Sequence, residues 1–203
     1  MSEFTVEKSE QYFDVLREIG NIGAGNATTA LASLMQSKVD MRVPQVKLLE
    51  FSEVGKLLGG EEQVMAGVYL AITGDIMGSI MFLVKEEVAM YLVNKMMMGM
   101  GSDLRGEMES SALKEISNII TGAYLNALST MTNLTILPSI PDLTIDMAGA
   151  ILSVPAIEFG QLGDKMLLIQ TEISDDIDID GFFIMVPDMD SYEKILSSLG
   201  IPV

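Results

Sequence analysis

The stretch Asp14-Val-Leu-Arg-Glu-Ile-Gly-Asn-Ile-Gly-Ala-Gly25 decides how this chain is read, because it occurs twice. Its counterpart, Ser111-Ala-Leu-Lys-Glu-Ile-Ser-Asn-Ile-Ile-Thr-Gly122, lies 97 residues further on, with Leu, Glu, Ile, Asn, Ile and Gly in register. A proline follows each asparagine at the same distance, as Pro44 and Pro141. Repetition of this length and order indicates a duplicated structural unit.

The second part of each unit also recurs. Gly78-Ser-Ile-Met-Phe-Leu-Val84 and Gly181-Phe-Phe-Ile-Met-Val186 each follow an apolar strand and a short polar turn, and each leads into a helix. The shift is 103 residues here, so we expect a small insertion in or near Gly160–Lys165. We therefore predict one domain over residues 1–203, made of two repeats at about 9–100 and 106–200.

Hydrophobic spacing predicts the elements of each repeat. Apolar side chains three and four residues apart indicate long helices over residues 9–35 and 107–131. Alternating or continuous apolar runs predict strands at 39–51, 64–72, 77–84, 143–154, 166–173 and 182–186, with shorter helices at 85–98 and 188–199. Pro44 predicts an edge strand or a bulge. The pattern favours an α+β fold with pseudo-two-fold symmetry, in which long helices pack on one mostly antiparallel sheet shared by both halves.

Charge and composition exclude several classes of function. Twelve basic residues against twenty-nine acidic ones give a net charge of −17, which argues against nucleic acid and anionic membrane surfaces as partners. The chain contains no cysteine and no histidine, so disulfides, thiolate nucleophiles, histidine bases and nearly all zinc chemistry are excluded. Any catalysis must use carboxylates, amides, hydroxyls, amines or a borrowed metal.

Targeting signals are not evident. The N-terminus has mixed charge without an apolar core, which is unlike a signal peptide. The longest uncharged run, between Glu115 and Asp142, contains several asparagines and two prolines, so no membrane-spanning helix is expected. A cytoplasmic location is the default expectation.

The repeated helix face is the candidate functional surface. Glu and Asn at positions i and i+3 stand side by side on a helix. An acid or serine lies one turn before them and a glycine one turn after. The set is Asp14, Glu18, Asn21 and Gly25 in the first copy, and Ser111, Glu115, Asn118 and Gly122 in the second. One copy would be an ordinary solvated face, but two copies with a mid-helix asparagine, a poor helix former, favour a function.

This doubled pattern, an Asp or Ser, then Glu, Asn and Pro at fixed spacing, resembles the signature of the CheC/CheX/FliY family of phosphatases in bacterial and archaeal chemotaxis. The resemblance covers essentially the whole chain and is strongest to the two-site CheC members. It implies an aspartyl-phosphate phosphatase that acts on a phosphorylated CheY-type response regulator.

The resemblance also implies roles for the repeated residues. Asn21 and Asn118 would orient a water molecule, while Glu18 and Glu115 would pair with the regulator's active-site lysine. A glutamate acting as general base is the weaker alternative. The glycines, Gly25 and Gly122, would let the regulator approach, and Asp14 and Ser111 would give supporting contacts. The chain would need no metal or cofactor of its own, because the regulator supplies Mg²⁺.

Two other functions stay open. A non-catalytic adaptor could bind the regulator or the receptor deamidase CheD, which the family also binds. The segment Ile145–Ile151, read physically as an apolar strand, resembles the region near the CheD-binding surface, and Asp146 is its candidate contact. A flagellar-switch component is disfavoured, because no further module follows Val203.

Three other features resemble known binding sites, but we favour a structural interpretation of each. Gly20-Asn-Ile-Gly-Ala-Gly25 lacks the order and the preceding strand of a nucleotide-binding loop. Asp176-Ile-Asp-Ile-Asp180 begins like a calcium loop, but Pro187 replaces the closing glutamate. A hairpin turn is favoured there, and a weak cation site stays open. The seventeen methionines are expected mainly to fill the core rather than form a binding surface.

Overall fold

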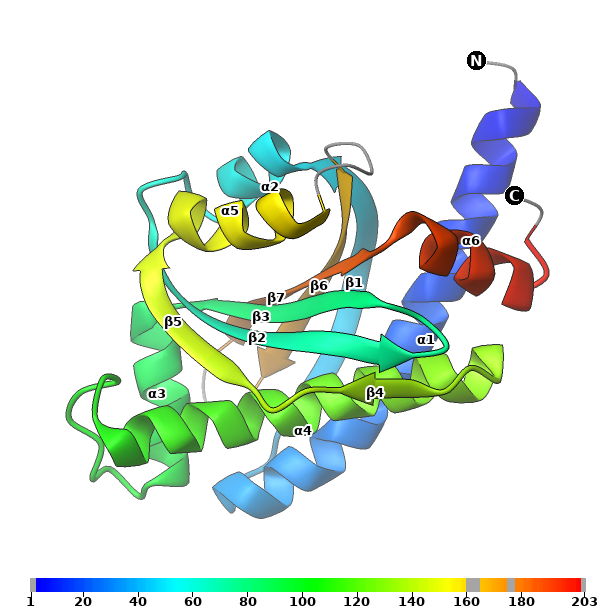
Figure 1. The fold of residues 1–203 in the computed structure, drawn as a ribbon. Helices are drawn as coiled ribbons and strands as arrows, with labels where there is room; N and C mark the ends of the chain where they lie inside the picture. Colours follow the sequence, from blue (N-terminus) through cyan, green and yellow to red (C-terminus); the bar gives the residue numbers. More distant parts are fainter. Residues whose placement is uncertain (1–2, 160–164, 175–177, 202–203) are drawn as a thin grey trace.

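The computed structural model of the chain describes residues 3–159, 165–174 and 178–201 (Figure 1). The first repeat contains α1 (Glu3–Met35), β1 (Asp40–Glu50), α2 (Phe51–Leu57), β2 (Val64–Gly74), β3 (Gly78–Lys85) and α3 (Glu86–Met96). The second contains α4 (Glu107–Thr132), β4 (Ile136–Pro138), β5 (Asp142–Met147), α5 (Ala148–Phe159), β6 (Lys165–Ser174), β7 (Asp178–Pro187) and α6 (Met189–Ser198). The second predicted repeat has the element order of the first, except that β4 and β5 stand in place of β1.

The strands form one seven-stranded sheet that joins the two repeats. Its order is β1-β6-β7-β3-β2-β4, with β5 also paired to β2, and the pairings are antiparallel. Strand β1 pairs with β6 of the other repeat, β3 pairs with β7, and β5 pairs with β2. The predicted α+β class, with an antiparallel sheet under long helices, is confirmed.

Helices cover both faces of the sheet. Figure 1 shows the long helices α1 and α4 crossing on one face and the short helices α2 and α5 side by side on the other. The buried side chains accordingly form two clusters. The larger contains residues of α1, α3, α4 and α6, and the smaller contains residues of α2 and α5. The sheet therefore separates the repeated motif on α1 and α4 from the short helices.

The pairing register places the pseudo-two-fold axis and corrects one expectation. Val68 pairs with Phe82 as Ile169 pairs with Phe183, so the hairpins correspond at a shift of 101 residues, not 103. Phe82 and Phe183 also pair with each other between β3 and β7, and their ring centroids lie 4.8 Å apart. The axis therefore passes through this pair of rings. The expected insertion site at 160–165 lies almost entirely outside the described residues.

The short helices α2 and α5 were missed by the sequence prediction. The strand expected at 143–154 is wrong beyond Met147, where the chain turns into α5. Ala148, Ile151 and Leu152 are buried at the spacing of one helix face. A short apolar run does not distinguish a buried strand from a buried helix, so the sequence pattern predicts a strand where the chain forms a helix.

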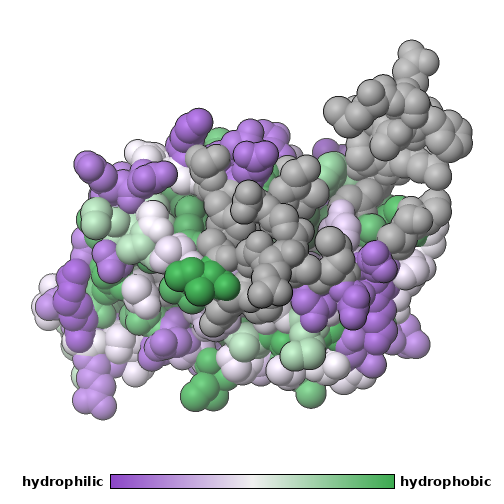
Figure 2. Space-filling model, turned by 45° about the horizontal axis from the view of Figure 1, so that its top comes forward, coloured by the Kyte–Doolittle hydropathy of each residue, from purple (hydrophilic) through white to green (hydrophobic). Residues whose placement is uncertain are grey.

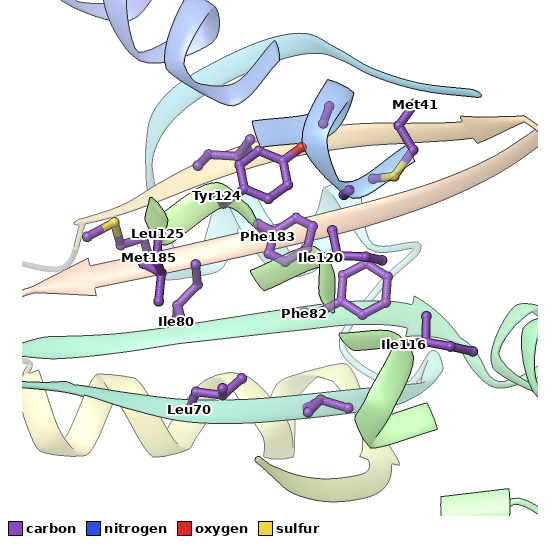
Figure 3. Packing of buried hydrophobic residues seen from close by; sticks show 14 of the residues in the cluster. Met41, Leu70, Ile80, Phe82, Ile116, Ile120, Tyr124, Leu125, Phe183 and Met185 are labelled. Carbon is purple, nitrogen blue, oxygen red and sulfur yellow. The ribbon is translucent and has the colours of Figure 1, made fainter. Parts of the chain in front are cut away.

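A stack of aromatic rings connects the long helices to the sheet. Figure 3 shows Tyr124 of α4 above Phe183, which lies above Phe82. The centroids of Tyr124 and Phe183 are 4.7 Å apart, and the Tyr124 hydroxyl lies 2.9 Å from Thr171 Oγ1 on β6. Burial raises the pKa of the Tyr124 phenol, so it stays protonated at neutral pH. These contacts hold the crossing of α1 and α4 in place over the sheet.

Candidate functional site

The structure places both copies of the repeated helix motif at the surface. We call Asp14, Glu18, Asn21 and Gly25 on α1 the first ridge, and Ser111, Glu115, Asn118 and Gly122 on α4 the second ridge. The glutamate and asparagine of each ridge are exposed, whereas residues on the opposite side of each helix, such as Leu16 and Ile120, are buried. The structure therefore leaves both Glu/Asn pairs accessible to another molecule.

The three glycines of the first ridge segment have three different environments. A Cβ built at Gly20 would meet the side chain of Val43 on β1 at 3.2 Å, and one built at Gly23 would meet Tyr124 Cα at 2.9 Å. Apart from the adjoining backbone of its own helix, no described atom lies within 4 Å of a Cβ built at Gly25, and the same is true of Gly122. Gly20 and Gly23 thus permit close packing inside the protein, while Gly25 and Gly122 leave open space on the ridges.

The two ridges point away from each other. Gly23 faces α4, and Asn21, two residues earlier, lies about 160° around the helix from it at 100° per residue. Tyr124 faces α1, and Asn118, six residues earlier, lies about 120° from that direction. Each asparagine therefore points away from the other helix, and the ridges form two separate surfaces.

The carboxamide of Asn21 is held by a strand. Its Oδ1 accepts a hydrogen bond from the backbone N–H of Val43, with 3.0 Å between the two atoms. Asn118 makes no side-chain hydrogen bond with any residue that the structure describes. The position equivalent to Val43 is Ile140, which is 89% exposed, whereas Val43 is 3% exposed. The two sites share their residues but differ in how the carboxamide is fixed.

A β-bulge presents the Val43 N–H to Asn21. Arg42 pairs with Glu172 and Gln45 pairs with Gln170, so Val43 and Pro44 together lie opposite one residue of β6. A bulge takes such residues out of the ladder of hydrogen bonds between strands. Because β1 is also at the edge of the sheet, the prediction made from Pro44 is confirmed.

The charges around the ridges differ as well. Asp14 forms an ion pair with Arg17, with 2.9 Å between Oδ1 and the guanidinium. In the second copy Ser111 replaces the acid, and the corresponding Lys114 has no ion pair among the described residues. The first ridge thus carries an internally compensated pair, while the second offers an uncompensated cation beside Glu115.

The loop before α4 fixes the start of the second ridge. The carboxylate of Glu109 accepts hydrogen bonds from the backbone N–H and the hydroxyl of Ser102, at 3.0 and 3.3 Å. The hydrogen bond from the Ser102 backbone holds the pKa of Glu109 below its ordinary value. The first turns of α4 are therefore anchored at neutral pH, where this carboxylate is ionised.

The described residues, 3–159, 165–174 and 178–201, contain no cluster of metal ligands and no membrane-spanning helix. Over those residues, no group of three or more Asp, Glu, His or Cys side chains could hold a metal ion. Within the same residues, no helix is long and apolar enough to cross a membrane. Asp176 of the calcium-like run lies outside the described residues, and β7 already begins at Asp178.

Comparison with known proteins agrees with this geometry. A family model described as the CheC-like family matches residues 14–48 and 108–145, which contain both ridges and both prolines. The CheY-P phosphatase CheC of Bacillus subtilis (strain 168) is 39% identical over 207 residues, covering 98% of this chain and 99% of that protein.

Solved structures show the same fold. The crystal structure of Thermotoga maritima FliY aligns with a TM-score of 0.74 at 20% identity, covering 94% of this chain and 96% of that one. The FliM middle domain of H. pylori aligns with a TM-score of 0.67 at 16% identity, covering 98% and 99%. Fold and site together define a duplicated α+β protein with two exposed Glu/Asn ridges. The chain belongs to the CheC-like family.

Proposed function

We propose that this protein is a phosphatase of chemotaxis signalling that hydrolyses the aspartyl phosphate of a phosphorylated CheY-type response regulator. The observation that carries the proposal is the pair of exposed Glu/Asn ridges in a chain that matches a CheY-P phosphatase over nearly its full length. A protein that only bound a partner would not need a glutamate and an asparagine at the same places in both repeats.

The reaction requires positioning more than acid–base chemistry. A water oxygen attacks phosphorus, the bond from phosphorus to the aspartate oxygen breaks, and inorganic phosphate and the free carboxylate result. The asparagine carboxamide would orient the water in line with the leaving oxygen, as a glutamine does in GTPases. Such positioning can supply several kcal/mol, about 7–11 in the most favourable intramolecular reactions. An amide does not titrate, so the absence of histidine is no obstacle.

Glu18 and Glu115 would anchor the regulator. Each stands one turn from its asparagine on an exposed helix face, where it can pair with the lysine of the receiver's active site. The open space over Gly25 and Gly122 lets the receiver's backbone approach the helix. In this proposal Asp14 and Ser111 make supporting contacts, and the Mg²⁺ at the phosphoaspartate belongs to the regulator.

The proposal is tested by the decay of phosphate on a radiolabelled CheY-type regulator, with and without the protein. We expect acceleration by the wild type and decay at the spontaneous rate with Asn21→Ala/Asn118→Ala. The matched control is Asn26→Ala/Asn126→Ala, which removes two exposed asparagines from the same helices outside the ridges. Acceleration by the first double variant equal to that of the control would contradict the proposed function.

Binding of CheD is a second candidate role, and it rests on a different surface. Asp146 lies exposed on β5, where its Oδ1 accepts a hydrogen bond from the Met147 N–H at 2.7 Å. Nearby apolar side chains are also exposed, including Val154 at 45% and Ile157 at 82%. Figure 2 turns the α2 and α5 end toward the reader and shows apolar surface between hydrophilic residues. This surface fits a protein partner, and a CheD pull-down with Asp146→Lys would test it.

A further inference from the structure

The hydrogen bond between Val43 and Asn21 is made at the bulge in β1. A residue before proline favours extended backbone, so Pro44 holds Val43 in the strand conformation. The bulge takes the Val43 N–H out of the ladder with β6, and this N–H reaches the Oδ1 of Asn21 at 3.0 Å. A paired N–H in a regular ladder would not be available to a helix side chain.

The close packing of Val43 against α1 depends on Gly20. The two γ-carbons of Val43 would lie 3.2 and 3.3 Å from a Cβ at position 20, which is closer than ordinary van der Waals contact. Gly20 is one residue before Asn21 and faces β1, so it sets how near the strand comes to the helix. The absent side chain therefore lets the strand approach closely enough to reach the carboxamide.

The second repeat has a bulge-like break between β4 and β5 at this place, but Ile140 does not pack against the helix as Val43 does. Ser139 exchanges hydrogen bonds with Ala71, its N–H to the carbonyl at 2.8 Å and its Oγ from the N–H at 3.0 Å. Asp142 pairs with Tyr69, so Ile140 and Pro141 together lie opposite one residue, as Val43 and Pro44 do. The difference lies on the helix side of this bulge.

Ser117 stands where the first repeat has Gly20. It is fully buried, and its hydroxyl donates to the carbonyl of Leu113 at 2.8 Å. Its Cβ fills the position that Val43 approaches in the first repeat, and the larger Ile140 stays 89% exposed. Asn118 is accordingly left without a strand partner among the described residues.

We propose that Gly20, Val43 and Pro44 form a positioning unit that presets the carboxamide of Asn21 for catalysis, and that the second site works without one. The inference rests on the phosphatase function proposed above and adds residues that touch neither water nor phosphate. With Oδ1 bound to the strand, the amide plane is fixed, and its NH₂ group and second lone pair remain for the water and the phosphoryl oxygens. The rotation that Asn118 must lose on binding is already lost at Asn21.

The direct test removes a single N–H in the full-length protein. In an Asn118→Ala background, which isolates the first site, Val43 is replaced by its α-hydroxy acid so that an ester takes the place of the amide. We expect kcat for the phosphorylated regulator to fall about fivefold with KM within twofold, the factor that one intramolecular hydrogen bond contributes. Gly20→Ser, which introduces the residue of the second repeat, should act in the same direction and speed hydrogen exchange of the Val43 amide.

Two comparisons separate positioning from general destabilisation. Gly55→Ala on α2, where a new Cβ would have an ordinary contact at 3.5 Å, should leave kcat unchanged. In an Asn21→Ala background, Ser117→Gly/Ile140→Val should let residue 140 pack against α4 as Val43 packs against α1. We expect slower hydrogen exchange of the residue 140 amide and a higher kcat.

An ester variant with unchanged kcat would overturn the inference, as would one with a raised kcat, which would mean that the bond restrains Asn21. The phosphatase function would survive either result, provided that Asn21→Ala still abolished the remaining activity in the Asn118→Ala background. If it did not, the proposed function itself would have failed.

Discussion

The two repeats share one fold, but they contribute side chains of different size to the interface between α1 and α4. At the crossing of α1 and α4, the first repeat contributes Gly23 and Ala27, and the corresponding residues of the second are Ile120 and Tyr124. All four are buried, and Gly23 lies directly against Tyr124. Bulk lost from one helix is thus supplied by the other, which is what a close-packed interface requires. After duplication, volume needs to be preserved only across the pair.

The surface of the repeats behaves in the opposite way. The exposed glutamates and asparagines are not part of the buried core, yet they are identical in the two copies. Beside them, Gly20 with Val43 and Ser117 with Ile140 give one tethered and one untethered carboxamide. Buried positions of the two repeats thus exchanged large and small side chains, while the ridges kept the same glutamate and asparagine. The ridges differ in whether a strand holds the asparagine.

The largest effect is expected from reversing the charge of both ridges. Glu18→Lys/Glu115→Lys replaces an attraction to the receiver's lysine by a repulsion, each worth up to about 4 kcal/mol for charges 4 Å apart at an effective dielectric of 20. We expect acceleration of regulator dephosphorylation to fall by about a hundredfold, or about 2.7 kcal/mol. The neutral pair Glu18→Gln/Glu115→Gln should lose less, and equal losses in the two pairs would argue against a cationic partner group.

Filling the open space on one ridge should disable that ridge alone. Gly25→Leu places a side chain where the receiver would approach, and in an Asn118→Ala background we expect dephosphorylation to fall about tenfold, as about 1.4 kcal/mol of lost contact would produce. Circular dichroism and thermal unfolding should show an intact fold, because leucine is a better helix former than glycine. Gly122→Leu in the same background should have no effect on rate, and any comparable loss there would break the assignment of Gly122 to a separate ridge.

The divergence of the ridges predicts two regulators per chain. Because Asn21 and Asn118 face away from each other, receivers on the two ridges should not compete for space. Titration calorimetry with a regulator held in its phosphorylated-like state by beryllofluoride should give two receivers per protein, and Glu18→Lys should reduce this to one. A wild-type stoichiometry of one would contradict the separation of the surfaces.

The packing role of Gly23 predicts a smaller effect, on stability alone. Gly23→Ala forces a Cβ to within 2.9 Å of the Tyr124 backbone, and overpacking of this kind costs about 1–3 kcal/mol, partly offset by about 1 kcal/mol of helix propensity. Denaturant unfolding should therefore show a net loss, whereas Gly25→Ala should be neutral or stabilising. Equal free energies of unfolding for the two variants would show that α1 and α4 are less closely packed than the structure indicates.

Much of the fold and the location of the ridges could be predicted from the sequence. The offset of 97 residues gave the duplication, the helical spacing gave α1 and α4, and Pro44 indicated the bulge. Both Glu/Asn pairs were expected on a solvated helix face, and the structure shows them exposed. The roles of these residues in catalysis stay predictions.

What could not be predicted depends on contacts between distant segments. The bond from the Val43 N–H to Asn21 joins residues 22 apart in sequence, and it is made at the bulge of β1 against β6, which no local pattern specifies in full. Likewise α5 reads as an apolar run whose helical form is decided by the sheet face that it covers. The fixed spacing from each asparagine to its proline was the one signal that could have suggested the strand contact.

The central claim is that two separate ridges each dephosphorylate the regulator, and the rates of four proteins test it most directly. The initial rate of phosphate loss is measured with the wild type, Asn21→Ala, Asn118→Ala and the double variant at equal concentration. After subtraction of spontaneous decay, we predict that the rates of the single variants add up to the wild-type rate and that the double variant adds nothing. Residual acceleration by the double variant would contradict the account.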